Sequence, residues 1–507
     1  MTVDHDRSWV RGVDLELRPD PARVVAELFL PGQELAASGL SRSTEVLERV
    51  LALSHDEVTR ELAALLSTFD SGHRNLTATW ESHSALVEHR LEDGAEISPA
   101  RRSLIGAYFT REVSIEGAAL CNPSMAPHPD QSGLAPGSTR FVMTVRAVGE
   151  GHLSSVELRT GIVDAAGVVS LDPLPDAATL PGPLPSSWSR AAFTDQLRDM
   201  WGDHTNSDFV LDSLPETFDR ADLDTALAHL HSQRVTRGVA AKTIDRFEFI
   251  AACSYSVEFA EATLEQERVL MPRGPAESRG MEDVRLVRFV DDDGQVDYLG
   301  TYTAYDGNQI ALQLIVTRDF RRFDMTRLAG PGSRNKGLAL FPRRIGGRYV
   351  ALSRADRESN GVTWSDDLCR WSEPVLVQTP TQDWELIQLG NCGPPIETDR
   401  GWLVLTHGVG PMRQYSIGAL LLDLDDPTRV VGRLRRPLLV PEPNSRSGYV
   451  PNVVYSCGGM LHGSTLVLPY GCNDATIRMA LISLEPLLAE LVASPDGETD
   501  RTSEETP

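Results

Sequence analysis

The chain has 507 residues, of which 41% are hydrophobic and 24% are charged, as is typical of a soluble globular protein with two domains or one large repeated architecture. Its formal net charge of −24 argues against a nucleic-acid partner, because binding to phosphate backbones depends on clustered Lys and Arg. The sequence contains neither a signal-peptide core nor a run of about 20 apolar residues, which predicts no membrane partner and a cytoplasmic location.

Six cysteines are scattered along the chain, without a CxxC pair or a neighbouring His at zinc spacing. We expect them to be reduced and buried. No metal site and no cofactor is predicted from the sequence.

The first segment, residues 1–110, is predicted to be a helical N-terminal region. Leu47 and Val50 belong to an apolar face at helical spacing. The tetrapeptide from Ser54 to Glu57 is typical of a capping box that opens a second helix.

The pattern of residue types changes after Arg111. Short runs rich in Val, Leu, Thr and aromatic residues alternate with Gly, Pro and Asp turns up to Leu484. This pattern predicts a mainly antiparallel β architecture, and a propeller is the most economical one for this length. Blades of about 45 to 70 residues would number roughly five. We therefore expect a catalytic β-propeller over residues 111–486.

A helical insertion is predicted at about residues 186–237. Leu223, Leu227 and Leu230 form a helical stripe that interrupts the β texture. The insertion is expected either to cover the mouth of a site or to form a subunit contact, so a homo-oligomer is one of the forms expected. Residues 487–507 are acidic and polar and are predicted to be a disordered tail.

The segment from Gly280 to Arg285 contains the first candidate functional residues, and the segment from Thr301 to Gly307 follows it. Within it, Glu282 and Asp283 stand beside Arg285, at the start of a predicted strand. A carboxylic acid next to an arginine is a common arrangement for a general acid. The alternative is a surface ion pair, which would contribute little.

A second set of residues could form a local anion site in this acidic protein. Each stands near a predicted strand, and the loops at one face of a propeller converge on its central channel. Together these side chains suit an anion such as phosphate, whereas each alone is more often solvated or structural. They are Lys336, Arg354, His407 and Tyr415.

Ordered sequence blocks carry a family resemblance over about residues 116–484. They are Asn122-Pro123, Arg146-Ala147-Val148, Gly280 to Arg285, Thr301 to Asp306, Asn335-Lys336, Gly393-Pro394-Pro395, His407-Gly408-Val409, Ala419 to Leu424, Asn452 to Tyr455 and Tyr470 to Asp474. With these blocks the chain resembles glycoside hydrolase family 130, the inverting β-mannoside phosphorylases and related β-mannosidases. The resemblance implies a five-bladed β-propeller.

The resemblance also implies roles for individual residues. Asp283 would be the general acid, and inorganic phosphate, the co-substrate, would attack from the opposite face. The products would be α-mannose 1-phosphate and a shortened acceptor. An inverting displacement needs one acid and one nucleophile, so phosphate can replace a second carboxylate. The phosphate site would be Lys336, Arg354, His407 and Tyr415, and the β-mannoside would contact Asn122, Arg146, Glu282, Arg285, Tyr305, Asp306 and Asp474.

Two positions depart from the family pattern, namely Val284 in place of Pro and Gly337 in place of Asp. Two other functions stay open on the same scaffold. One is a β-mannoside hydrolase, which is expected to lose the phosphate-binding His and Tyr, so the presence of His407 and Tyr415 favours phosphorolysis. The other is a noncatalytic carbohydrate-binding or interaction propeller, which the presence of Asp283 disfavours.

Overall fold

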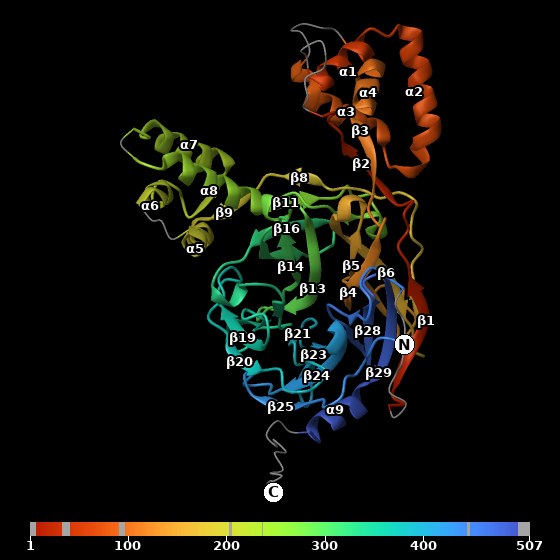
Figure 1. The fold of residues 1–507 in the computed structure, drawn as a ribbon, viewed down its shortest axis with the longest axis vertical. Coiled ribbons are helices and arrows are strands. Elements are labelled where there is room, and N and C mark those ends of the chain that lie inside the picture. The colour runs from red at the N-terminus through yellow and green to blue at the C-terminus, as the bar shows by residue number, and fades with distance from the viewer. Residues whose placement is uncertain are drawn as a thin grey trace.

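The computed structural model describes residues 7–32, 41–90, 97–201, 205–235, 237–443 and 447–494. The protein is mainly β, with a helical unit near the N-terminus and a second helical unit inserted among the strands (Figure 1). The predicted fold class is therefore confirmed at this level.

Among the described residues, the N-terminal helical unit contains four α-helices. They are α1 (Arg42–Leu51), α2 (His55–Phe69), α3 (Leu76–Val87) and α4 (Pro99–Tyr108). The predicted capping box is present, since the side chains of Ser54 and Glu57 each accept from the other's backbone N–H. Leu47, Val58 and Leu104 pack in the shared apolar core. Figure 1 shows this unit above the sheets, attached through two strands.

Those two strands form a hairpin stem. β2 (Val24–Leu28) pairs antiparallel with β3 (Thr110–Ser114), and the last pair in the register is Leu28 with Thr110. The helical unit thus lies at the tip of this stem.

Residues 1–110 are not helical throughout, which the sequence prediction missed. β1 (Val10–Leu17) pairs with the last strand of the chain, and both its ends are buried. Val13, Leu15 and Leu17 alternate with polar residues, which is the period of a strand with one buried face. The edge strand β1 was missed because its partner lies more than 450 residues away in the sequence.

The remaining strands form successive antiparallel groups. The first is β4 (Ala119–Pro127), β5 (Thr139–Val148), β6 (Ser154–Val163) and β7 (Val169–Leu171), with β12 (Val269–Leu270) beside β6. The second is β13 (Gly280–Val290), β14 (Val296–Tyr305), β15 (Ile310–Thr317) and β16 (Arg322–Arg327), extended by β11 (Tyr255–Glu258) and β8 (Gly182–Leu184). One parallel bridge, between Gly280 and Ser154, joins the two groups.

Three further groups follow in chain order. The third is β17 (Ala339–Leu340), β18 (Tyr349–Ser353), β19 (Asn360–Ser365) and β20 (Val375–Gln378). The fourth is β21 (Gln388–Asn391), β22 (Ile396–Thr398), β23 (Gly401–Gly410), β24 (Gln414–Leu422) and β25 (Val430–Arg433). The fifth is β26 (Val454–Tyr455), β27 (Met460–His462), β28 (Thr465–Cys472), β29 (Thr476–Ser483) and β1. Central strands such as β23 are buried along their whole length, as expected where sheets pack on both faces.

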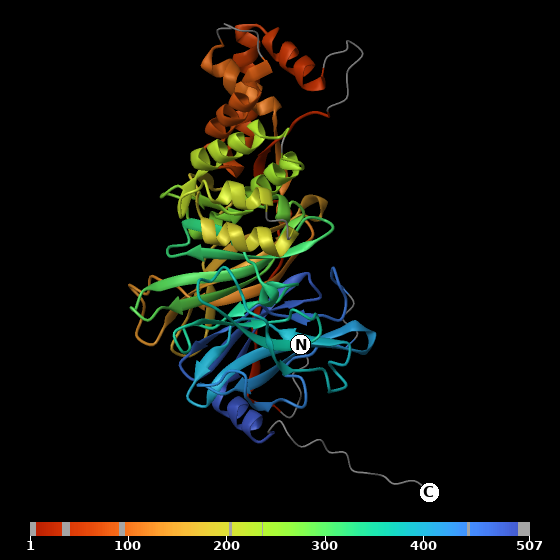
Figure 2. The same ribbon diagram turned by 90° about the vertical axis from the view of Figure 1, so that its left-hand side faces the viewer.

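The helical insertion extends beyond its predicted end at residue 237. A short strand pair, β9 (Ser187–Ser189) and β10 (Thr217–Asp219), accompanies α5 (Arg190–Trp201), α6 (Thr205–Leu211), α7 (Arg220–Ser232) and α8 (Ala240–Cys253). Phe247 and Ile250 of α8 share a core with Leu223 and Leu227 of α7, so α8 belongs to the insertion. Figures 1 and 2 show these helices beside the second strand group.

The C-terminal part also differs from the prediction. α9 (Leu484–Val492) covers the first residues of the segment predicted to be a tail from 487. Leu487, Leu488 and Leu491 are buried against the fourth and fifth groups, which explains why the helix continues. Residues 495–507 lie outside the described residues. Within the described ranges, no helix is long and apolar enough to cross a membrane.

Candidate active site

Two β-bulges position the acid and its nearest amide. The β13–β14 register shifts between Glu282 and Arg285, and the β4–β5 register shifts between Cys121 and Ser124. Within these shifts Asp283 has φ 59° and Asn122 has φ 49°. Left-handed backbone at non-glycine residues costs energy, and bulges commonly redirect side chains at active sites. Here the two bulges bring the two side chains together.

Asp283 is 8% exposed and lies among hydrogen-bond donors. Asn122 Nδ2 donates to Asp283 Oδ1 at 2.5 Å, and Arg146 Nη1 lies 3.4 Å from the same oxygen. Burial acts to raise the pKa of the Asp283 carboxyl, but three neighbouring cations hold it below its ordinary value. The cations are Arg146, Arg285 and Lys336. The carboxyl is therefore held as a carboxylate.

Glu282 also forms an ion pair with Arg146. Arg146 Nη2 donates to Glu282 Oε1 at 2.7 Å, and Arg146 also donates to the hydroxyl of Ser154 at 3.0 Å. The charges of Asp283 and Glu282 raise the pKa of the half-buried Arg146 despite desolvation. Arg146 is thus fixed between two carboxylates.

Arg354 and His407 form the centre of the predicted anion site, and both are buried. Arg354 Nη1 donates to His407 Nε2 at 2.9 Å, while His407 Nδ1 lies 3.2 Å from the carbonyl of Asn391. Burial and the charges of Arg354 and Arg285 hold the pKa of His407 well below its ordinary value. A neutral imidazole with its proton on Nδ1 satisfies both contacts.

Arg285 is linked to the same histidine by a tyrosine that contacts both. Arg285 Nη2 donates to the hydroxyl of Tyr455 at 2.8 Å, and the Tyr455 ring meets His407 edge-on at 4.9 Å. Tyr415 stacks on His407, with ring centroids 6.1 Å apart. Within the described residues, neither Arg285 nor Arg354 forms an ion pair, and the Nε of each is buried without a hydrogen-bond partner. Two buried guanidinium groups without an ion-pair partner make a site for an anion.

The turn that carries Lys336 is attached to this centre. Asn335 Nδ2 donates to the carbonyl of Arg354 at 3.1 Å, and Asn391 Nδ2 donates to the carbonyl of Gly337 at 2.6 Å. Lys336 itself is half-buried, and its charge acts on both Asp283 and Asp474. It is thus within electrostatic range of both carboxylates.

Asp474 follows β28 in a left-handed turn with φ 48°. Burial, and then the negative charge of Asp283, raise the pKa of Asp474 to about 6, although Arg146 acts in the opposite direction. The two carboxyl groups of Asp283 and Asp474 therefore share one electrostatic environment.

Tyr305 and Asp306 are less closely tied to the acid. Tyr305 pairs with Gly280 at the start of β13, and its hydroxyl donates to the carbonyl of Gly307 at 2.8 Å. Asp306 Oδ1 accepts from the backbone N–H groups of Asn308 and Gln309, which holds the turn after β14. A substrate role for both residues stays a prediction.

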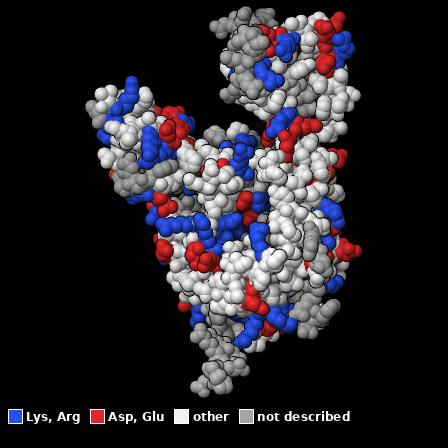
Figure 3. All heavy atoms as spheres, viewed as in Figure 1, with Lys and Arg blue, Asp and Glu red and all other residues white. Residues whose placement is uncertain are grey.

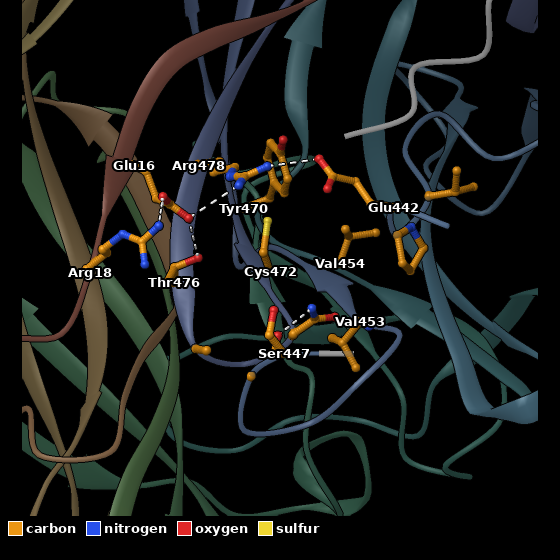
Figure 4. Close-up of a pocket in the computed structure, with 15 residues that line it drawn as sticks. Glu16, Arg18, Glu442, Ser447, Val453, Val454, Tyr470, Cys472, Thr476 and Arg478 are labelled. Carbon is orange, nitrogen blue, oxygen red and sulfur yellow. Dashed lines mark hydrogen bonds and ion pairs between the residues drawn. The ribbon is translucent and has the colours of Figure 1, made fainter. Parts of the chain in front are cut away.

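A separate cavity of about 260 Å³ adjoins Asn473, the residue before Asp474. Figure 4 shows Arg478 between Glu16 and Glu442 on its wall. Asn473 Nδ2 donates to the carbonyl of Ser447 at 2.9 Å in the same region. These contacts fasten the segment that presents Asp474 to the site.

Sequence reasoning missed Asn391 and Tyr455 as parts of the site. Tyr455 ends the block Asn452 to Tyr455, and Asn391 lies two residues before the block Gly393-Pro394-Pro395. The signal was available, but only the structure shows Tyr455 between Arg285 and His407.

Comparison with known proteins identifies the family. The sequence model of glycoside hydrolase family 130, described as beta-1,4-mannooligosaccharide phosphorylase, matches residues 234–492, which is slightly more than half of the chain. The chain belongs to glycoside hydrolase family 130. It is a member of a family of enzymes, and the resemblance found in the sequence is confirmed.

Several relatives of this family-130 protein are similar over much of their length. A 1,2-beta-oligomannan phosphorylase of Thermoanaerobacter sp. is 36% identical over 219 residues, which cover 42% of this chain and 71% of that protein. A Beta-1,2-mannobiose phosphorylase of Listeria innocua is 29% identical over 261 residues, covering 49% and 72%. The solved structure of the Listeria innocua enzyme with beta-1,2-mannobiose aligns over 76% of this chain and 93% of that one, with a TM-score of 0.45 and 20% identity.

Proposed function

We propose that this protein catalyses the inverting phosphorolysis of β-mannosides, giving α-mannose 1-phosphate and a shortened acceptor. One observation carries the proposal. Arg354 donates to the neutral His407, and Arg285 donates to the tyrosine beside that ring. Both guanidinium groups are buried, and neither forms an ion pair with a carboxylate within the described residues. A phosphate dianion would satisfy both guanidinium groups, whereas a water molecule would neutralise neither.

In this mechanism Asp283 supplies the proton. The family resemblance implies that the proton reaches the glycosidic oxygen through a hydroxyl of the mannosyl ring. Asn122 and Arg146, which contact Asp283, would orient both that ring and the acid. Asp474 would accept hydrogen bonds from the same sugar, and Glu282 would hold Arg146 in place.

Phosphate takes the place of the second carboxylate of an inverting glycosidase. The residues that would hold it are Lys336, Arg354, His407 and Tyr415. Arg285, which donates to Tyr455 beside His407, would add a further positive charge. The neutral ring of His407 accepts from Arg354 and so orients that guanidinium group without repelling it. Pre-orienting a charged nucleophile in a buried site accounts for much of the rate enhancement of such enzymes.

Binding of phosphate would also make Asp283 a better acid catalyst. In the unliganded protein the cations hold the pKa of this carboxyl below its ordinary value. A bound dianion offsets their charge, so the pKa of Asp283 rises and the protonated acid becomes more populated. Phosphate binding would thus increase the fraction of Asp283 that is protonated and able to donate.

We further propose that the five strand groups are the blades of one propeller, with residues 111–486 as the catalytic domain. Contacts that link successive groups into a closed series support this. Parallel bridges join the first group to the second, the second to the third, the fourth to the fifth and the fifth to the first. The third and fourth are linked by the Leu389 N–H, which donates to the Glu358 carbonyl. In this arrangement β1, from residues 1–110, completes the last blade.

The decisive experiment measures the products with and without phosphate. The protein is incubated with β-1,2- and β-1,4-mannobiose, and α-mannose 1-phosphate and free mannose are followed. We expect mannose 1-phosphate only when phosphate is present, and its loss by at least about 1,000-fold in Asp283→Asn. Cleavage to free mannose in phosphate-free buffer would instead establish the hydrolase, and saccharide binding without turnover would establish a carbohydrate-binding protein. A cytoplasmic location and a homo-oligomer stay predictions.

A further inference from the structure

A row of side chains leads from the protein surface to the buried cations. The Cζ atom of the exposed Arg413 lies 5.5 Å from the centroid of the Tyr415 ring. That ring is nearly parallel to the His407 ring, with an interplanar angle of 13°. His407 in turn accepts from Arg354 at 2.9 Å. Arg413 is therefore the outermost member of a continuous row that ends at the proposed phosphate site.

The backbone around Arg413 is held in an unusual conformation. Arg413 lies in the tight connection between β23 and β24, closed by the pairing of Gly410 with Gln414. Met412 and Arg413 have φ values of 57° and 55°, and both are left-handed without being glycine. Such strain persists only where surrounding structure imposes it, and it concentrates at ligand-binding segments. Here the two long strands impose it, and the turn places the guanidinium over Tyr415.

The charge of Arg413 also reaches the mannosyl side of the site. Burial and Asp283 raise the pKa of Asp474 to about 6, whereas Arg146 and Arg413 act to lower it. The same guanidinium thus lies over Tyr415 and within electrostatic range of Asp474.

An entering phosphate must approach a protein of formal net charge −24. Arg285 and Arg354 are only 2% and 8% exposed, so they hold an anion that has already entered. An exposed cation that contacts the outer side of this row would raise the local phosphate concentration and its association rate. Figure 3 shows Lys and Arg side chains gathered below the helical insertion on a face that carries both signs of charge.

We infer that Arg413 is the phosphate-capture residue of this enzyme: it binds the incoming phosphate over Tyr415 and passes it inward to Arg354 and His407. The inference rests on the proposed phosphorolysis and adds a residue that the sequence patterns did not indicate. Because Arg413 stands at the surface, its replacement leaves the buried packing unchanged.

The test compares Arg413→Gln and Arg413→Lys with the wild type and with Arg60→Gln, which removes the same charge from the distant helix α2. Phosphate saturation curves are measured at low and high ionic strength. Arg413→Gln is expected to raise the KM for phosphate about three- to tenfold at low salt, with a smaller change in kcat, and the difference shrinks at high salt. Arg413→Lys is expected to restore part of the affinity, and Arg60→Gln to match the wild type.

Calorimetric titration with inorganic phosphate keeps the test independent of turnover. Weaker phosphate binding by Arg413→Gln than by Arg60→Gln supports the inference. Equal binding, or an effect confined to the KM for the mannoside, overturns it. A wild-type protein that forms no mannose 1-phosphate would overturn the proposed function, and the phosphate titration would still decide the role of Arg413.

Discussion

The buried guanidinium groups of Arg285 and Arg354 repel one another, and burial together with this repulsion lowers the pKa of Arg354. Burial and the charges of both arginines lower the pKa of His407. Buried charges without partners are costly to a folded protein. Their retention is therefore best explained by a ligand that neutralises them. At the scale of single residues, the site is incomplete until an anion binds.

The first prediction concerns the proton on Asp283. In the unliganded protein, cations hold the pKa of the Asp283 carboxyl below its ordinary value, and a bound phosphate would raise it, so this carboxyl should take up a proton when phosphate binds. Calorimetry in buffers of different ionisation enthalpy measures this uptake. We expect Asp283→Asn to take up roughly half a proton less than the wild type at the pH between the two pKa values. Identical uptake in both proteins would show that phosphate does not act on this carboxyl.

At the scale of secondary structure, irregular strand pairing and one distant edge strand position the site. The bulges in β4 and β13 direct Asn122 and Asp283 toward each other. β1 adds to β29 and covers what would otherwise be the exposed edge of the last group. The regular strands form the rigid frame, and the two bulges direct the side chains of the proposed site.

The second prediction tests how β1 is anchored. Arg7, just before β1, is 2% exposed and donates to Glu490 of α9 and to the carbonyl of Pro437. Arg7→Ala leaves these acceptors without a partner and should reduce the free energy of unfolding by about 2 kcal/mol. Thermal and urea unfolding measure the change. Arg18→Ala is the matched control, because Arg18 is 72% exposed in its pair with Glu16 and should change stability by less than about 1 kcal/mol.

At the scale of the whole molecule, both helical units extend from the β framework. The N-terminal unit stands on the β2–β3 stem, and Arg74 of the segment before α3 forms a two-bond contact with Glu267. The insertion α5–α8 has its own apolar core. All proposed catalytic residues come from the strand groups and their connections, so the chemistry should not depend on the first unit.

The third prediction removes that unit. Replacing residues 29–109 by a short glycine-rich turn joins Leu28 to Thr110, which already face each other in the stem. We expect kcat on mannobiose to stay within about threefold, with a modest loss of stability from the lost Arg74–Glu267 contact. Size-exclusion chromatography of both proteins records any change in oligomeric state. Loss of phosphorolysis in a variant that still folds would place part of the site in the helical unit.

Local periodicity was enough to predict the mainly β class and the two helical units, and short blocks of residue types singled out Asp283, Arg354 and His407 as candidate site residues. The sequence by itself could not determine the pairing of β1 with β29, the extent of α8 or the position of Tyr455. Those features depend on contacts between segments far apart in the chain. Only the tertiary structure placed Arg285 and Arg354 around one histidine, since the field at a buried site is the sum of charges that no local pattern records.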